Sequence, residues 1–252
     1  MPHLPVSGME VSLRPLDGAD ALMLQESNDH PVAVALALLA RVARPLEGTA
    51  DWAALTVTDF ELLVAALRVQ ALGPRLQCGF LCPHRGCGER VELGFAMAEY
   101  LAPVRPTRPR GVVPVEGRPG WFDLDGACFR LPSAVDQVAA LSGGGIRLLV
   151  QRCLEPSDLA GPARARVERA MAVMAPQVSR PVGGHCPACG AAVEAALHLP
   201  ALVITELRHA AAWVLDEVHL IAGAYGWSET AILALPAPRR QDYARRIRRQ
   251  VA

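Results

Sequence analysis

The spacing of apolar positions predicts a protein built mainly from helices. Residues 17–43 read as one helix around the run VAVALALLARVA, which ends before Pro45. Thr58 and Glu61 form a capping box for a second helix, and Gly73 stands where a C-terminal glycine belongs. Apolar residues three and four apart predict a long helix over 200–223, with one face in the core: Val203, Leu207, Ala210, Val214, Val218 and Ile221.

Shorter stretches alternate as strands do. Residues 9–16 predict a weak strand, and residues 75–95 predict two strands around a turn that carries cysteines. Residues 121–131 predict a hairpin that turns at Asp125-Gly126. Further helices are predicted from Ser133 to about Leu141, near 146–154 and 162–174, from Ser228, and at the arginine-rich end beyond breaks at Pro236 and Pro238.

The composition narrows the functional class. Of the 252 residues, 52% are hydrophobic and 20% are charged, which is typical of a globular protein. The 25 basic residues balance the 25 acidic ones, so no net charge draws the chain to nucleic acid or to an anionic membrane. All 25 basic residues are arginine, which excludes Schiff-base lysines and the P-loop lysine. Neither a membrane span nor a secretion signal is evident, so we expect a cytoplasmic protein.

Two segments share one cysteine layout. CPHRGCGERVELGF (82–95) and CPACGAAVEAALHL (186–199) each contain Cys-Pro, a short turn, Cys-Gly and an alternating stretch. Each reads as a knuckle that offers two thiolates, and two knuckles supply the four-sulfur shell of a structural zinc site. The predicted ligands are Cys82, Cys87, Cys186 and Cys189, and the nearby alternates are Cys78, His84 and His185.

The expected fold class is therefore α+β, mainly helical, with short β-hairpins that form a split four-cysteine zinc ribbon. We expect an N-terminal helical region, a first knuckle hairpin, a Pro/Arg-rich linker, a hairpin with helices, a second knuckle hairpin and a C-terminal helical interaction region. Their boundaries are 1–73, 74–102, 103–120, 121–181, 182–200 and 201–252.

Other chemistry-bearing residues predict no enzyme. Four thiolates leave zinc no open position for water or for a small-molecule substrate. Cys128 and Cys153 read as small core residues, and Gly143 to Gly145 as a flexible joint. Glu206 with His209, and Asp216 with His219, read as a solvated or partner-facing polar stripe, because on one helix the two pairs lie about 15 Å apart. No nucleophile elbow is present.

Several motifs together resemble the T-even-type phage baseplate hub assembly chaperone family. They are the two Cys-Pro knuckles, the Gly-Pro-Arg-Leu that leads into the first, Glu217-Val218-His219, the stretch from Tyr225 to Glu229, and Ile232 to Pro236 before the arginine-rich end. Members occur in tailed phages and in phage-tail-like contractile injection systems. The first knuckle departs from the family pattern, since His84-Arg85 lengthens its gap, and the segment 103–120 is particular to this chain.

The resemblance implies a non-enzymatic chaperone or component of a baseplate, with baseplate or tail proteins as partners. Large aromatic residues and a local positive charge offer contacts for such partners: Trp213, Tyr225, Trp227, Arg245 and Arg246. The alternative is a zinc-ribbon protein that binds nucleic acid or acts in transcription through Arg105, Arg108, Arg110 and the arginine-rich end. The zero net charge and the scarcity of aromatic residues between those arginines, where Tyr243 stands alone, argue against it.

Overall fold

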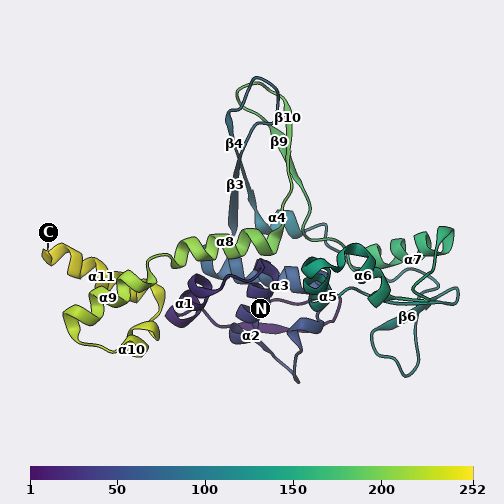
Figure 1. Cartoon of the computed structure of the whole chain (residues 1–252), viewed down its shortest axis with the longest axis horizontal. Coiled ribbons are helices and arrows are strands. Elements are labelled where there is room, and N and C mark those ends of the chain that lie inside the picture. The colour runs from purple at the N-terminus through teal and green to yellow at the C-terminus, as the bar shows by residue number, and fades with distance from the viewer. Residues whose placement is uncertain (252) are drawn as a thin grey trace.

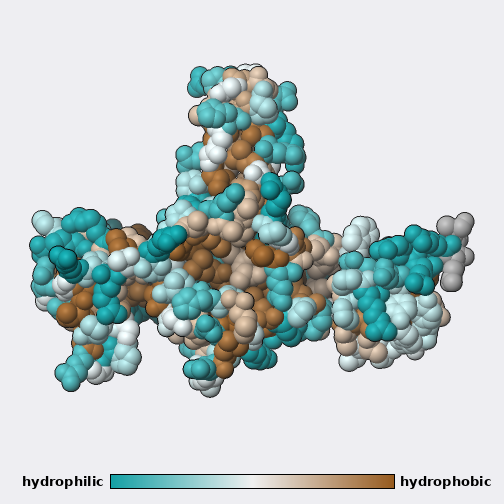
Figure 2. Space-filling view, turned by 180° about the vertical axis from the view of Figure 1, so that it is seen from behind, coloured by the Kyte–Doolittle hydropathy of each residue, from teal (hydrophilic) through white to brown (hydrophobic). Residues whose placement is uncertain are grey.

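A computed structural model gives the fold of residues 1–251, with side chains for residues 1–249. A central helical body carries a long arm of two β-hairpins, with a sheet-containing lobe and a C-terminal helical lobe at opposite ends (Figure 1). The predicted α+β class is confirmed. Seen from behind, hydrophobic residues gather on the body and the lower arm, and hydrophilic residues cover much of the arm tip and the two ends (Figure 2).

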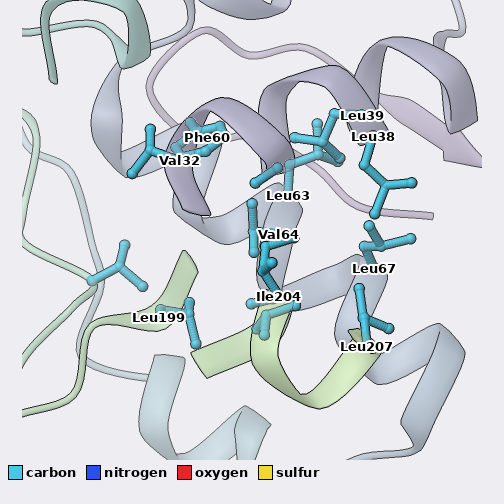
Figure 3. Close-up of a cluster of buried hydrophobic side chains, with 14 of the residues drawn as sticks. Val32, Leu38, Leu39, Phe60, Leu63, Val64, Leu67, Leu199, Ile204 and Leu207 are labelled. Atoms are coloured by element: carbon cyan, nitrogen blue, oxygen red, sulfur yellow. The ribbon is translucent and has the colours of Figure 1, made fainter. Parts of the chain in front are cut away.

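The body is formed by four helices that enclose one apolar cluster. Phe60, Leu63, Leu38 and Leu39 are completely buried there, next to Ile204 and Leu207 (Figure 3). Its helices are α1 (Gly18–Glu26), α2 (Pro31–Val42), α3 (Val57–Leu72) and α8 (Leu199–Ala211), and its strands are β1 (Val11–Leu13) and β2 (Ala43–Pro45).

The prediction of one helix over 17–43 is wrong, because the chain breaks between α1 and α2. Pro31 has no N–H to donate and fits the first turn of a helix rather than its interior. The Nδ1 atom of His30 caps the new helix by accepting the Val32 N–H at 3.3 Å. The apolar run is helical as far as Val42, where α2 ends, and its last residue, Ala43, begins β2.

The capping box predicted for α3 is also wrong, although the helix and its end at Gly73 are confirmed. Thr56 is the N-cap, and its hydroxyl accepts the Asp59 N–H. The Thr58 hydroxyl instead donates to the Pro176 carbonyl at 2.9 Å. Glu61 is buried, and its carboxylate accepts hydrogen bonds from the backbone and side chain of Ser179, both at 2.8 Å. Two polar residues that look like local caps therefore make long-range contacts.

The predicted helix over 200–223 is two helices, α8 and α9 (Val214–Tyr225), with a break at Ala212 and Trp213. Ala210 is exposed and Ala211 is buried instead, because the buried stripe of α8 continues from Val203 and Leu207 in steps of four. Helix α8 packs on α1, α2 and α3, so it belongs to the body rather than to a C-terminal region 201–252.

The C-terminal lobe consists of α9, α10 (Glu229–Leu233) and α11 (Ala237–Val251), joined through Ile221, Ile232 and Ile247. The helix break falls at Pro236, whereas Pro238 lies inside the first turn of α11. Arg240 does not belong to a solvated arginine face: it is buried and donates to the Glu217 carboxylate at 2.6 Å.

The lobe at the other end contains a four-stranded antiparallel sheet of order β5-β6-β7-β8, covered by α7. Asp125 and Gly126 both have positive φ, 54° and 85°, as the predicted hairpin turn requires. Residues 103–120 are more than a linker, since Val112 is buried and β5 pairs with β6. The elements are β5 (Val113–Pro114), β6 (Trp121–Leu124), β7 (Ala127–Arg130), β8 (Leu154–Glu155) and α7 (Gly161–Met174).

Helices α5 (Ala134–Ala139) and α6 (Gly145–Cys153) connect β7 to β8, with the turn η2 (Ala140–Gly144) between them. Ser133 is the N-cap of α5, as predicted. Gly143 has a φ of 123°, so the glycine triplet forms a tight turn between the two helices. Cys153 is fully buried and Cys128 is partly buried, which confirms Cys153 as a core residue.

The order of elements repeats along the chain. A strand, two helices, an antiparallel strand, a further helix, a knuckle hairpin and a final helix occur first from β1 to α4 (Met97–Leu101), and again from β7 to α8. We call these stretches the first and second halves of the chain.

Matching side chains occupy the two halves. Asp20 and Asp136 are both completely buried third residues of capping boxes, and each accepts hydrogen bonds from two arginines. In each half one arginine stands six positions before the aspartate, and the other lies in the last turn of the following helix: Arg14 and Arg41, then Arg130 and Arg152. The chain therefore contains two copies of one structural unit.

Candidate metal centre

The arm consists of two separate hairpins, one from each half. Strands β3 (Arg75–Leu81) and β4 (Arg90–Ala96) pair only with each other, as do β9 (Val182–His185) and β10 (Ala192–Ala195). An isolated two-stranded hairpin is marginally stable in water. Contacts between side chains must therefore hold the two hairpins together.

Both hairpins end in the same local structure. The Cys82 N–H donates to the Glu89 carbonyl at 2.8 Å, and the Cys186 N–H donates to the Ala191 carbonyl at 2.9 Å. Each second cysteine is followed by a glycine with positive φ, Gly88 at 66° and Gly190 at 72°. These turns direct both cysteines of each knuckle toward the other hairpin.

The structure brings the four predicted cysteines together at the arm tip. All four sulfur atoms lie within 4.8 Å of one another. The closest pairs join the two hairpins: Cys82 Sγ is 3.8 Å from Cys189 Sγ, and Cys87 Sγ is 3.7 Å from Cys186 Sγ. A tetrahedral ion with metal–sulfur bonds of about 2.3 Å separates its sulfur ligands by about 3.8 Å. A disulfide would require about 2.05 Å. The four thiols can therefore hold a metal ion.

The surroundings of the sulfur atoms suit thiolates. Backbone N–H groups of His84 and Glu89 face the sulfur atoms of Cys82 and Cys87, and those of Ala188 and Cys189 face Cys186. Such donors are the outer-shell contacts that orient metal ligands. Cys82 and Cys186 are buried in one cluster with Val91 and Val193, whereas Cys189 is exposed.

Without a metal, Cys186 and Cys87 differ in pKa. The Cys189 N–H, against the effect of burial, lowers the pKa of Cys186 to about 7. The Glu89 N–H favours the Cys87 thiolate, yet burial and the neighbouring thiols raise the pKa of Cys87 to about 12. A bound cation favours thiolate at all four positions, because coordination requires deprotonated sulfur.

The alternate ligands are not part of this group. Within the described residues the group of metal-ligating side chains at the arm tip contains the four cysteines alone. The Cys78 thiol donates to the Leu93 carbonyl at 3.7 Å, lower on the arm. His84 contributes its carbonyl, which accepts the Cys87 N–H at 3.1 Å. His185 pairs with Ala192 at the end of β9.

The acidic pairs of the predicted polar stripe have separate surroundings. Glu206 lies on α8 with 25% of its side chain exposed and binds the buried Arg68 through two hydrogen bonds of 3.0 and 3.1 Å, so its carboxylate is held in an ion pair. Asp216 and His219 are exposed on α9, beyond the helix break. The two pairs therefore lie on two different helices.

The predicted partner-binding residues lie in or beside the C-terminal lobe. Trp213 stands at the α8–α9 break with 63% of its side chain exposed. Tyr225 and Trp227 form an exposed aromatic cluster with Tyr243, with ring centroids 5.2–5.8 Å apart. Arg245 and Arg246 are exposed on α11, where Arg245 also pairs with Asp242 at 2.9 Å.

The buried carboxylates Asp20 and Asp136 were missed in the sequence. Burial alone would raise the pKa of Asp136, but hydrogen bonds from Arg130, Ser133 and Arg152 hold it well below its usual range. The sequence contains a signal for them. In both halves an arginine, a helix-capping residue and the aspartate follow one another at intervals of three residues.

Comparisons with family models, curated proteins and solved structures find no match to this chain. Among the described residues, no helix combines the length and the apolar character needed to cross a membrane.

Proposed function

We propose that this protein is a non-enzymatic, zinc-stabilised assembly factor or component of the baseplate of a phage-like contractile injection system. The observation that carries the proposal is the tip of the arm. There, two hairpins that are far apart in the sequence bring four thiols together around one site for a metal ion. Four sulfur ligands complete a tetrahedral shell and leave no position for substrate or water, so the metal's role is structural.

Zinc suits this site best among the common metals. Thiolate ligands in tetrahedral arrangement are typical of zinc or iron–sulfur centres, whereas calcium and magnesium take oxygen ligands. The backbone N–H donors stabilise the thiolate charge that zinc requires. We expect about one zinc per chain by elemental analysis of the purified protein. Iron with a visible absorption band would contradict this metal assignment.

The C-terminal lobe supplies the surface for protein partners. Trp213, Tyr225 and Trp227 are large aromatic side chains left exposed, and such residues dominate interface energetics when a partner buries them. The assignment to a baseplate rests on the sequence resemblance, which extends through this lobe. We place this role in the bacterial cytoplasm, where tails assemble.

The test is affinity purification of the tagged protein from its native host, comparing free complexes with sedimented particles. Tail or baseplate proteins in the free fraction alone indicate a chaperone, and the same proteins in the particles indicate a structural component. Trp213→Ala should reduce their recovery, whereas Leu46→Ala, at an exposed position in the first half, should not. Recovery of polymerase subunits or nucleic acid without tail proteins would overturn the proposal and favour the transcription alternative.

A further inference from the structure

Helix α6 carries an apolar stripe whose counterpart in the first half is fully covered. Helices α2 and α6 end alike, with an arginine four positions before a proline: Arg41 before Pro45, and Arg152 before Pro156. Counting back from these arginines pairs each residue of one stripe with one of the other. Ala35, Leu38, Leu39 and Val42 thus correspond to Ile146, Leu149, Val150 and Cys153.

The burial of the two stripes differs. In α2 the four side chains are at most 2% exposed. In α6 Cys153 is fully buried and Leu149 and Val150 are partly buried, but Ile146 is 71% exposed. Leu141, in the adjoining turn η2, is 51% exposed. The second half therefore leaves open a surface that the first half closes.

Helix α8 closes that surface in the first half. Ile204 and Leu207 bury their side chains in the cluster that contains the α2 stripe (Figure 3), and Val203 belongs to the same cluster. Arg208 fixes α8 to the end of α1 by donating to the Leu24 and Ser27 carbonyls at 3.0 and 2.6 Å. An amphipathic helix is thus the element that this type of unit accepts.

The counterpart of α8 is α4, which also follows a knuckle hairpin but stops after five residues. Pro103, Pro106 and Pro109 follow and cannot continue a helix. The chain instead runs extended to α7, where the Thr107 N–H donates to the Val173 carbonyl at 3.0 Å. Helix α6 packs mainly on its own neighbours α5, η2 and β8, within the part of the chain that the structure describes.

We propose that the α6 face, formed by Leu141, Ile146, Leu149 and Val150, docks an amphipathic helix of a partner protein, as α2 receives α8. The charge around the face favours an acidic helix, because Arg147 is exposed and segment 137–154 contains no carboxylate. Arg152 is already paired with the buried Asp136, but Asp136 also binds Arg130, so this group of three charges keeps one net positive charge. The same charge argues against α11 of a second copy, which is rich in arginine. The proposal stands apart from the metal site and from the baseplate assignment.

The test uses a peptide that copies α8. Residues 199–211 are synthesised with the outward-facing Thr205, His209 and Ala210 changed to glutamate, and the peptide is stapled because so short a helix is marginal in water. Its binding to the full-length protein is followed by fluorescence anisotropy. We expect Ile146→Ser to weaken binding at least tenfold, and Arg147→Glu to weaken it severalfold. Val113→Ser, at a position 53% exposed on β5, should leave it unchanged.

Ile146→Ser should keep the unfolding temperature of the parent protein, since the side chain is already mostly in water. Failure of the parent protein to bind the peptide, or equal binding by Ile146→Ser, would overturn the proposal. Sedimentation of the protein alone provides the second readout. A dimer that depends on Ile146 would assign the face to a second copy instead of an acidic partner helix.

Discussion

The body and the arm tip reach a defined structure by different physical means. The body buries a large apolar cluster around Phe60 and Leu38, whereas the buried residues of the arm tip are Cys82, Val91, Cys186 and Val193. At about 25 cal/mol per Å² of apolar surface, the body's cluster can stabilise a fold, but two valines cannot hold two hairpins together. At the arm tip, four sulfur atoms that can hold a metal ion therefore stand where the two hairpins would otherwise need an apolar core.

The largest effect should follow from removing one knuckle. Cys186→Ser with Cys189→Ser should abolish metal binding and free the two hairpins, because structural zinc contributes on the order of 10 kcal/mol in zinc-finger peptides. Hydrogen exchange should show the loss of protection in β3, β4, β9 and β10, with α3 still protected. Retention of the metal in this variant would rule out the four-cysteine site.

A substitution in the core of the body should weaken the body and leave the metal site of the arm intact. Phe60→Ala should destabilise the body by about 3–5 kcal/mol, because it leaves a cavity among fully buried side chains. Metal content should stay at one ion per folded chain. Phe80→Ala, at a partly buried position on the arm, is the matched control and should leave urea unfolding of the body unchanged. If both variants lower the free energy of unfolding of the body equally, the arm and the body unfold as one cooperative unit.

Acid should weaken the fold through two buried aspartates, Asp20 in the body and Asp136 on α5. Burial opposes their ionisation, but arginine partners lower the pKa of both Asp20 and Asp136. A lowered pKa contributes stability that is fully present above the unfolded value, near 3.9, and is lost as pH falls through the folded value. Stability attributable to these groups should be level from pH 7 to 5 and fall below about pH 4, as each carboxylate takes up a proton and loses its ion pairs.

Urea titrations at each pH measure this loss. Asp136→Asn should lower stability at pH 7 and reduce the slope below pH 4. An unchanged slope in that variant would show that other carboxylates cause the acid sensitivity.

The smallest effect concerns the contact between the hairpins. A Cβ at Gly184 would lie 2.6 Å from Leu93 Cδ2, so Gly184→Val should displace the Leu93 side chain between the hairpins and cost about 1 kcal/mol. At Gly183 the nearest atom, the Val193 carbonyl oxygen, is 3.7 Å away, which makes Gly183→Val the matched control. Competition with a chelator should show weaker metal retention in the first variant only. Equal retention would mean that the thiols alone set the spacing of the hairpins.

The sequence predicted local features well and long-range ones poorly. The cysteine knuckles, the Asp125-Gly126 turn and the Ser133 cap depend on residues close in sequence, and the structure contains all three. Glu61 and Arg240 looked like a local cap and a solvated charge. Their partners, Ser179 and Glu217, lie far along the chain, and no local pattern could identify them.

The repeat was visible only in part. The cysteines revealed the repeated knuckles. The arginine–aspartate arrangement marks the two whole units, but the two halves share few identical residues around it. Helix α8 also packs on the other unit, so the division into regions in chain order separated elements that share one core.

The split between the knuckles has a consequence for synthesis. Cys82 and Cys87 leave the ribosome about 100 residues before Cys186 and Cys189. At about 5–20 residues per second, the first pair waits on the order of 5–20 seconds for its partners. During that time two thiols are open to oxidation or to a foreign metal. The yield of correctly assembled protein should therefore depend on the redox state and the zinc supply of the producing cell while each chain is being made.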